Sequence, residues 1–192
     1  AAFKAIFYSL SEKDQKVLCK LAVFPETFDA QAAGRVTEQN GESLQNISKY
    51  GLIKIDLTTK RYVLNCWIKE QVKGYLPETE LREAKIRHAT HYLSILDAAG
   101  ESFSKGGEAE GEGLNLFHQE WKNINCGLKQ VYKGSVEGKK SAELFNSYMK
   151  AGNRLFSFRF FPKEYRHYLE AALKGSQRLG LEKIEIFHLL NI

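Results

Sequence analysis

The sequence predicts a mainly α-helical protein that contains one small β-hairpin. Along most of the 192-residue chain, apolar residues recur at the period of an amphipathic helix. Between Leu52 and Leu64 that period changes to two, as in a pair of half-buried strands. Proline, which interrupts helices, occurs only 3 times. These observations define the helical class and place the hairpin in the N-terminal half.

Three short helices are expected before the hairpin. Ser11 and Asp14 form a capping-box pattern, in which the serine oxygen accepts from the N–H of residue 14 and the carboxylate reaches back. The helix that begins there ends at Phe24-Pro25. Asp29 is the expected N-cap of the second helix. The third helix covers Glu42 to Tyr50 and stops at the glycine that follows.

The hairpin is followed by a closing helix. Thr59-Lys60 is the expected turn between the two strands, and helical spacing then runs from Trp67 to Leu76, before Pro77. Three short helices, a two-stranded wing and a closing helix follow the order of a winged helix, a variant of the helix-turn-helix. We therefore expect a winged-helix domain over residues 1–77.

Residues 78–192 are expected to form a second, helical domain. The predicted helices are Glu80–Ala99, Leu114–Lys133, Lys139–Phe158, Pro162–Leu179 and one from Leu181 onward. Helices of this length with short connections pack antiparallel. Glycines alternate with acidic residues between Gly100 and Gly113, which indicates a mobile linker. Because the closing helix carries more apolar surface than a small winged helix covers, we expect the next helix to dock on it across Pro77.

Charge and cysteine content restrict the class of protein. The net charge of +5 comes from 28 basic and 23 acidic residues. Division of the chain after Glu78 gives 11 basic against 9 acidic residues in the first part and 17 against 14 in the second, so neither part is a basic tail.

Three cysteines, 47 and 60 positions apart, fit neither a disulfide framework nor a metal site, which favours a reducing, cytoplasmic compartment. No signal peptide or bilayer-spanning apolar run is present, so no membrane partner is expected. The missing initiator Met and the end in mid-pattern favour a fragment of a larger protein.

The chemical motifs argue against an enzyme. Gly134 to Ser141 resembles a phosphate-binding loop, but it has three residues between its glycines instead of four, and Lys140 separates Lys139 from the serine. We interpret this segment as a turn between helices. His88 and His91 lack a third ligand at the spacing of zinc enzymes, so no metal is expected. No nucleophile motif is present, and no catalytic residue is assigned.

A winged helix can bind DNA by placing its third helix in the major groove. The candidate contacts are Gln45, Asn46 and Lys49 on that helix and Lys60 and Arg61 in the wing. Because phosphate neutralisation supplies much of the affinity for DNA, so few cations argue against this role. A winged-helix transcription regulator with a helical ligand or dimerisation domain stays open as the alternative, because Gln45 and Asn46 can read bases.

The pattern of residues also resembles a known family. The run from Leu10 to Phe28 and the Leu52–Leu64 hairpin are similar to the winged-helix domain of NB-ARC or STAND signalling ATPases. Arg87–Leu93 and Trp121–Ile124 resemble the helical segment that follows it in members with TPR repeats. Phe161–Gly180 resembles the start of a TPR array, so the resemblance implies a TPR-like superhelical region.

The resemblance implies a regulatory function. This chain would link a nucleotide-binding switch, which it lacks, to a TPR-like sensor array through protein–protein contacts. The implied partners are the parent's own nucleotide-binding domain, a TPR ligand and further copies of the parent. ADP or ATP would bind the parent, with no cofactor in this fragment. In the family, a Met-His-Asp type motif at the end of the wing senses the ADP phosphate. The residues at the same place in this chain are Leu64-Asn65-Cys66. The resemblance therefore implies that Asn65 and Cys66 occupy the nucleotide-sensor position. A scaffold that binds protein on the concave side of its helices is a third hypothesis.

Overall fold

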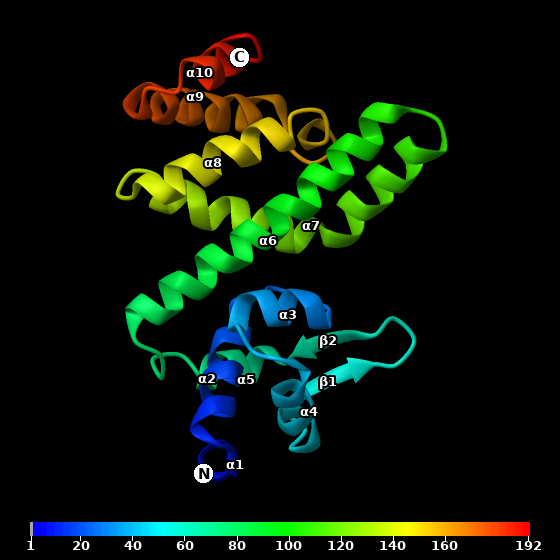
Figure 1. Ribbon diagram of the computed structural model, residues 1–192, viewed down its shortest axis with the longest axis vertical. Helices are drawn as coiled ribbons and strands as arrows, with labels where there is room; N and C mark the ends of the chain where they lie inside the picture. Colours follow the sequence, from blue (N-terminus) through cyan, green and yellow to red (C-terminus); the bar gives the residue numbers. More distant parts are fainter. Residues whose placement is uncertain (1) are drawn as a thin grey trace. The chain divides into compact units, whose positions relative to one another are not determined.

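The computed structural model in Figure 1 describes residues 2–192 and is mainly helical, with a single two-stranded antiparallel sheet in the described part. The predicted helical class and hairpin are therefore confirmed. The chain forms two compact units, which meet between His91 and Tyr92. This point lies within a long helix, whereas the sequence places the domain boundary ahead of that helix. None of the helices in the described residues is long and apolar enough to cross a bilayer.

The first unit holds the short helices and the hairpin. Its elements are α1 (Ala2–Ser9), α2 (Glu12–Leu21), α3 (Ala30–Thr37), α4 (Gly41–Lys49), β1 (Ile53–Asp56), β2 (Arg61–Leu64), α5 (Cys66–Gln71) and the first half of α6 (Glu78–Lys105). Both predicted N-caps are present. Ser11 Oγ accepts a hydrogen bond from the N–H of Asp14 at 3.1 Å, and Asp29 Oδ1 accepts one from the N–H of Ala32 at 2.7 Å. The Asp14 carboxylate accepts from the Ser11 hydroxyl at 2.9 Å. Gly51 follows α4 with φ +70°, as a left-handed stop requires.

The hairpin is a regular antiparallel pair, with Ile53 opposite Leu64 and Asp56 opposite Arg61. The Asp56 carboxylate accepts the N–H groups of Thr58 at 2.8 Å and Thr59 at 3.3 Å. These bonds stabilise the charged form and lower the pKa of Asp56. Lys60 completes the turn at φ +57°. The polar residues of this turn thus stabilise the hairpin that the sequence pattern predicts.

The aromatic surface of α5 is covered differently from the prediction. The helix α1 lies outside the predicted helices, and its buried Phe3 and Phe7 contact Trp67 and Tyr75 at ring distances of 5.7 and 4.7 Å. The helix α5 ends at Gln71, short of the predicted Leu76. Trp67 stays 56% exposed. The helix α1 therefore occupies part of the surface on which the helix after Pro77 was expected to dock.

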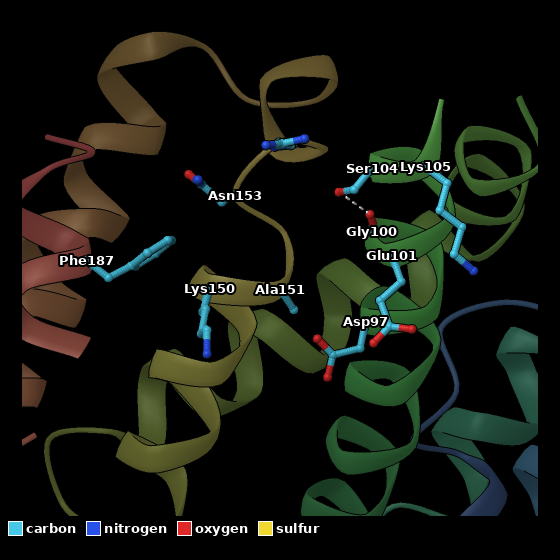
Figure 2. A pocket seen from close by; sticks show the side chains of 10 residues that line it. Asp97, Gly100, Glu101, Ser104, Lys105, Lys150, Ala151, Asn153 and Phe187 are labelled. Carbon is cyan, nitrogen blue, oxygen red and sulfur yellow. Dashed lines mark hydrogen bonds between the residues drawn. The ribbon is translucent and has the colours of Figure 1, made fainter. Parts of the chain in front are cut away.

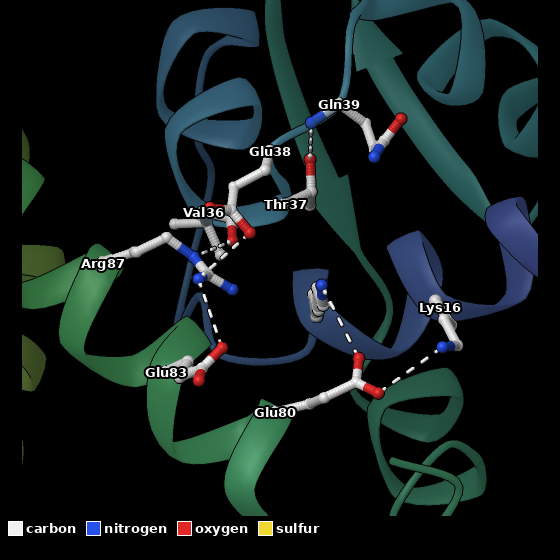
Figure 3. Close-up of polar contacts among 9 residues, drawn as sticks. Lys16, Val36, Thr37, Glu38, Gln39, Glu80, Glu83 and Arg87 are labelled. Atoms are coloured by element: carbon white, nitrogen blue, oxygen red, sulfur yellow. Dashed lines mark hydrogen bonds and ion pairs between the residues drawn. The ribbon is translucent and has the colours of Figure 1, made fainter. Parts of the chain in front are cut away.

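The first half of α6 is instead fixed to α2 and α3 by polar contacts (Figure 3). Glu80 accepts from Lys16 at 3.5 Å and lies 3.7 Å from the Lys20 ammonium. Arg87 donates through Nε to the carbonyl of Val36 at 2.9 Å and pairs with Glu38 at 3.1 Å. This part of α6 therefore belongs to the first unit.

The second unit contains the second half of α6, α7 (Glu108–Gly134), α8 (Lys139–Ala151), the 3₁₀ turn η1 (Phe156–Phe158), α9 (Pro162–Leu179) and α10 (Glu182–Leu189). In this unit, α8 packs on α7, α9 on α8 and α10 on α9 (Figure 1). Gly134 to Ser141 forms the predicted turn between two helices. The helix α8 ends at Ala151, before the predicted Phe158. The Phe156 ring then lies against Gly152, where a Cβ atom would have no room.

The predicted mobile linker from Gly100 to Gly113 is wrong. The helix α6 continues to Lys105, and α7 begins at Glu108 after a turn at Gly106 and Gly107, whose φ angles are +73° and +63°. Gly113 lies inside α7 and is buried against α6. A Cβ atom there would lie 2.5 Å from the Ala99 carbonyl oxygen and 2.6 Å from the Phe103 nitrogen. Gly113 therefore permits close packing of two helices.

A buried polar pair joins α8 to α10. Asn146 donates through Nδ2 to the Ala142 carbonyl at 2.9 Å, so its Oδ1 atom accepts from His188 Nε2 at 2.8 Å. Both side chains are fully buried, and His188 Nδ1 has no hydrogen-bond partner. Burial lowers the pKa of His188 from 6.5 to about 4. The imidazole is therefore neutral at pH 7, with its proton on Nε2.

Candidate functional site

The position matched to the nucleotide sensor lies at the start of α5. Asn65 is the N-cap, and its Oδ1 atom accepts from the N–H of Trp67 at 2.8 Å. Asn65 and Cys66 are both exposed. The side-chain oxygen of Asn65 therefore caps α5. This arrangement explains a local structural role for Asn65 and leaves the Cys66 thiol accessible.

The candidate DNA contacts on α4 differ in their availability. Gln45 and Lys49 lie one turn apart and are exposed. Asn46 is half-buried, and its Nδ2 atom lies 3.4 Å from the Asp14 carboxylate on α2. Asn46 is thus directed toward the interior of the first unit, where it cannot reach a base edge.

The two candidates in the hairpin also differ. Lys60 is exposed at the turn, whereas Arg61 donates through Nε to Thr27 Oγ1 at 2.9 Å and through Nη2 to the Thr27 carbonyl at 3.0 Å. Arg61 therefore connects the hairpin to the segment before α3. Of the three cations proposed for phosphate contacts, Lys49 and Lys60 are the two that extend into solvent.

The second unit contains a groove that the sequence analysis missed, and we call it the α6–α8 groove (Figure 2). Its volume is about 580 Å³, within the range of ligand sites. Asp97 and Glu101 line it from α6, Lys150 from α8 and Phe187 from α10. Gly100 and Ala151 also line the groove, at a place where α6 and the end of α8 lie close together. A Cβ atom on Gly100 would lie 2.9 Å from the Ala151 carbonyl oxygen.

The α6–α8 groove is lined by charges of both signs. The α6 wall carries Asp97, Glu101 and Lys105, and Lys150 lies on the α8 wall (Figure 2). Arg154, in the segment after α8, also lines the groove. No ion pair within 4.0 Å joins these walls in the described residues. Partial burial raises the pKa of Asp97, the Glu101 carboxylate raises it further, and Lys150 opposes the shift. A cationic group beside Asp97 and Glu101 would therefore relieve the unfavourable charge between these two carboxylates.

The α6–α8 groove is lined mainly by polar and charged residues. Its charged side chains are exposed, and no Ser, Cys or His nucleophile with a neighbouring base lines it. Across residues 2–192, no three His, Cys, Asp or Glu side chains lie together as a metal site would require. His88, one of the two histidines weighed as ligands, is buried with its ring edge against Phe24 at 5.2 Å.

Sequence patterns contain part of the signal for the groove. Asp97 and Glu101 have the four-residue spacing that places side chains on one face of a helix, whereas Arg154 lies beyond the end of α8. The spacing does not reveal which helices face one another. That depends on the close approach at Gly100, which the sequence analysis assigned to a linker.

Comparisons of the chain with models of known protein families, with curated proteins and with solved structures give no match.

Proposed function

We propose that this chain is a regulatory interaction fragment of a STAND-type signalling ATPase. A winged-helix domain, formed by α2 to α4, the β1–β2 hairpin and α5, is joined to a TPR-like helical array. The fragment links a nucleotide-binding switch outside this chain to a sensor surface by protein–protein contacts. The sequence resemblance supports the family, and the order of the elements supports the two parts.

The observation that carries the binding role is that alternate helices, α6, α8 and α10, line one groove. In stacked helical repeats, alternate helices line a common face, which then receives a segment of another protein. The opposite charges of Asp97 and Lys150 suit an extended polypeptide with acidic and basic side chains. Phe187 adds an apolar contact on the same surface.

Two measurements test this proposal. The full reading frame should encode a phosphate-binding loop upstream of residue 1. In the full-length parent, exchange of ADP for an ATP analogue should then change the hydrogen-exchange protection of the helices that line the groove. Lys150→Glu should reduce that change, whereas Lys163→Glu, exposed on α9 and outside the groove, should preserve it. A reading frame without such a loop, or identical exchange in both nucleotide states, would show that the proposal is wrong.

We expect the chain by itself to show no ATP hydrolysis and no nucleotide binding in the micromolar range. The segment from Gly134 to Ser141 connects two helices, so it lacks the strand–loop–helix context that wraps a phosphate in backbone N–H groups. Phosphate release and calorimetry with Mg-ATP check this. Turnover that survives repurification and disappears in Lys139→Ala would contradict our interpretation of this segment.

We expect this chain to bind duplex DNA weakly and without sequence preference. The transcription-regulator alternative is therefore the second candidate function. Arg61 and Asn46 are held by Thr27 and Asp14, so few groups are left for phosphates and bases. A mobility-shift titration at two salt concentrations checks this, with Gln45→Ala expected to have no effect. A tight complex at physiological salt that Gln45→Ala or Lys49→Ala weakens would favour the alternative.

A further inference from the structure

A second cavity in the helical unit carries only positive charge, and we call it the α7–α9 pocket. Its volume is about 330 Å³. Lys133 at the end of α7 and Lys174 and Arg178 on α9 line it, and no acidic side chain is among its described lining residues. Lys174 and Arg178 are one helical turn apart, so they lie on the same face of α9. The pocket lies apart from the α6–α8 groove and shares no lining residue with it.

Apolar surface forms the rest of the pocket. Ala171 contributes a methyl group to the lining, and Gly175 contributes backbone where α9 packs closely against Asn146 of α8. Val136, in the turn between α7 and α8, is 75% exposed at the edge of this space. Tyr132 adds a ring whose hydroxyl group is hydrogen-bonded to His167 at 2.9 Å. The pocket therefore combines cations with an apolar wall.

The turn that forms one wall is held in place from α9. The Arg178 guanidinium donates to the carbonyl of Ser135 and, at 2.9 Å, to that of Val136. The Ser135 hydroxyl donates back to the Tyr132 carbonyl at 2.7 Å. These bonds fix the backbone of the segment that resembles a phosphate loop in composition. A wall ordered in advance reduces the entropic cost of binding a ligand.

We propose that the α7–α9 pocket binds an anionic group attached to an apolar body. Lys133, Lys174 and the remaining N–H groups of Arg178 hold the anion, and Val136, Ala171 and Tyr132 contact the body. Carboxylates and phosphate esters share this chemistry, because both accept charge-assisted hydrogen bonds from lysine and arginine. The proposal is independent of the regulatory function, because it involves a different cavity and different residues.

The test is a titration of the isotope-labelled chain with phenyl phosphate and, separately, phenylacetate, followed by amide NMR shifts at low salt. We expect saturable shifts at Ser135, Val136 and the 171–178 segment, with dissociation constants of about 1 mM, which is typical of small fragments. Inorganic phosphate, which lacks the apolar body, and benzyl alcohol, which lacks the charge, should bind more weakly. The tighter of the two aromatic anions identifies the preferred head group.

Three variants make the test specific. Lys174→Gln should weaken binding about fivefold to tenfold through the loss of one charged contact. Lys163→Gln, exposed on the same helix but outside the pocket, should leave binding unchanged. Ala171→Leu fills the cavity while keeping every cation, so it should abolish the saturable shifts. Absence of saturation with both anions, equal weakening by the two lysine variants, or normal binding to Ala171→Leu would overturn the proposal.

Discussion

Replacement of Gly113 by alanine is expected to destabilise the helical unit by about 3 kcal/mol. In a helix, alanine is ordinarily favoured over glycine, so the sign of this effect depends on packing. The new Cβ atom would lie 2.5 Å from the Ala99 carbonyl oxygen and 2.6 Å from the Phe103 nitrogen. Both are backbone atoms of α6, which cannot rotate away as a flexible side chain can. The two helices would have to separate, with loss of contacts along their interface.

Gly111 provides the matched control, two residues earlier in α7. It is exposed, and a Cβ atom there would meet no atom within 4 Å. Gly111→Ala should therefore stabilise the unit by about 0.5–1 kcal/mol through helix propensity alone. Urea unfolding followed by Trp121 fluorescence measures both effects in a Trp67→Phe background, since the chain has 2 tryptophans. Similar effects for the two variants would show that Gly113 does not set the helix spacing.

Acidification is expected to destabilise the same unit through His188. Because burial lowers the pKa of His188 to about 4 in the folded state, the unfolded chain, with a pKa of 6.5, binds the proton first as pH falls. The stabilisation is complete above pH 6.5 and is lost progressively between pH 6.5 and 4. At about 1.4 kcal/mol per pH unit, the full loss is about 3 kcal/mol.

A substitution separates this effect from the titration of carboxylates. In His188→Gln the amide can still donate to Asn146 Oδ1, but no proton binds in this pH range. The decline in stability between pH 6.5 and 4 should therefore be smaller in this variant than in the parent chain. His167→Gln, at an exposed position on α9, should retain the parental pH dependence. An unchanged decline in His188→Gln would assign acid sensitivity to other groups.

Local signals in the sequence predict the first unit well where they depend on neighbouring residues. Ser11 and Asp29 cap their helices because a side-chain oxygen needs only the N–H three residues ahead. The change of period after Gly51 predicts the hairpin for the same reason. The helix α1 is missed, because the burial of its Phe3 and Phe7 depends largely on distant Trp67 and Tyr75.

Glycines are the main source of error in the second unit. The sequence analysis treats Gly100 and Gly113 as linker residues, yet both lie in helices where another backbone passes close by. Composition alone does not distinguish a glycine that permits a turn from one that permits close packing. The α6–α8 groove could not be predicted for this reason. The candidate sites in the first unit were located as residues, but the contacts of Asn46 and Arg61 depend on the tertiary fold.

The differing exposure of the three cysteines makes the protein suitable for site-selective chemical labelling. Cys66 is exposed at the first position of α5, whereas Cys19 is buried and its burial raises the pKa of the thiol to about 12. Cys126 is half-buried in α7. Because thiolates react with maleimides and protonated buried thiols do not, a fluorophore should attach to Cys66 first, without mutagenesis. The dye would then report on changes in the surroundings of the start of α5.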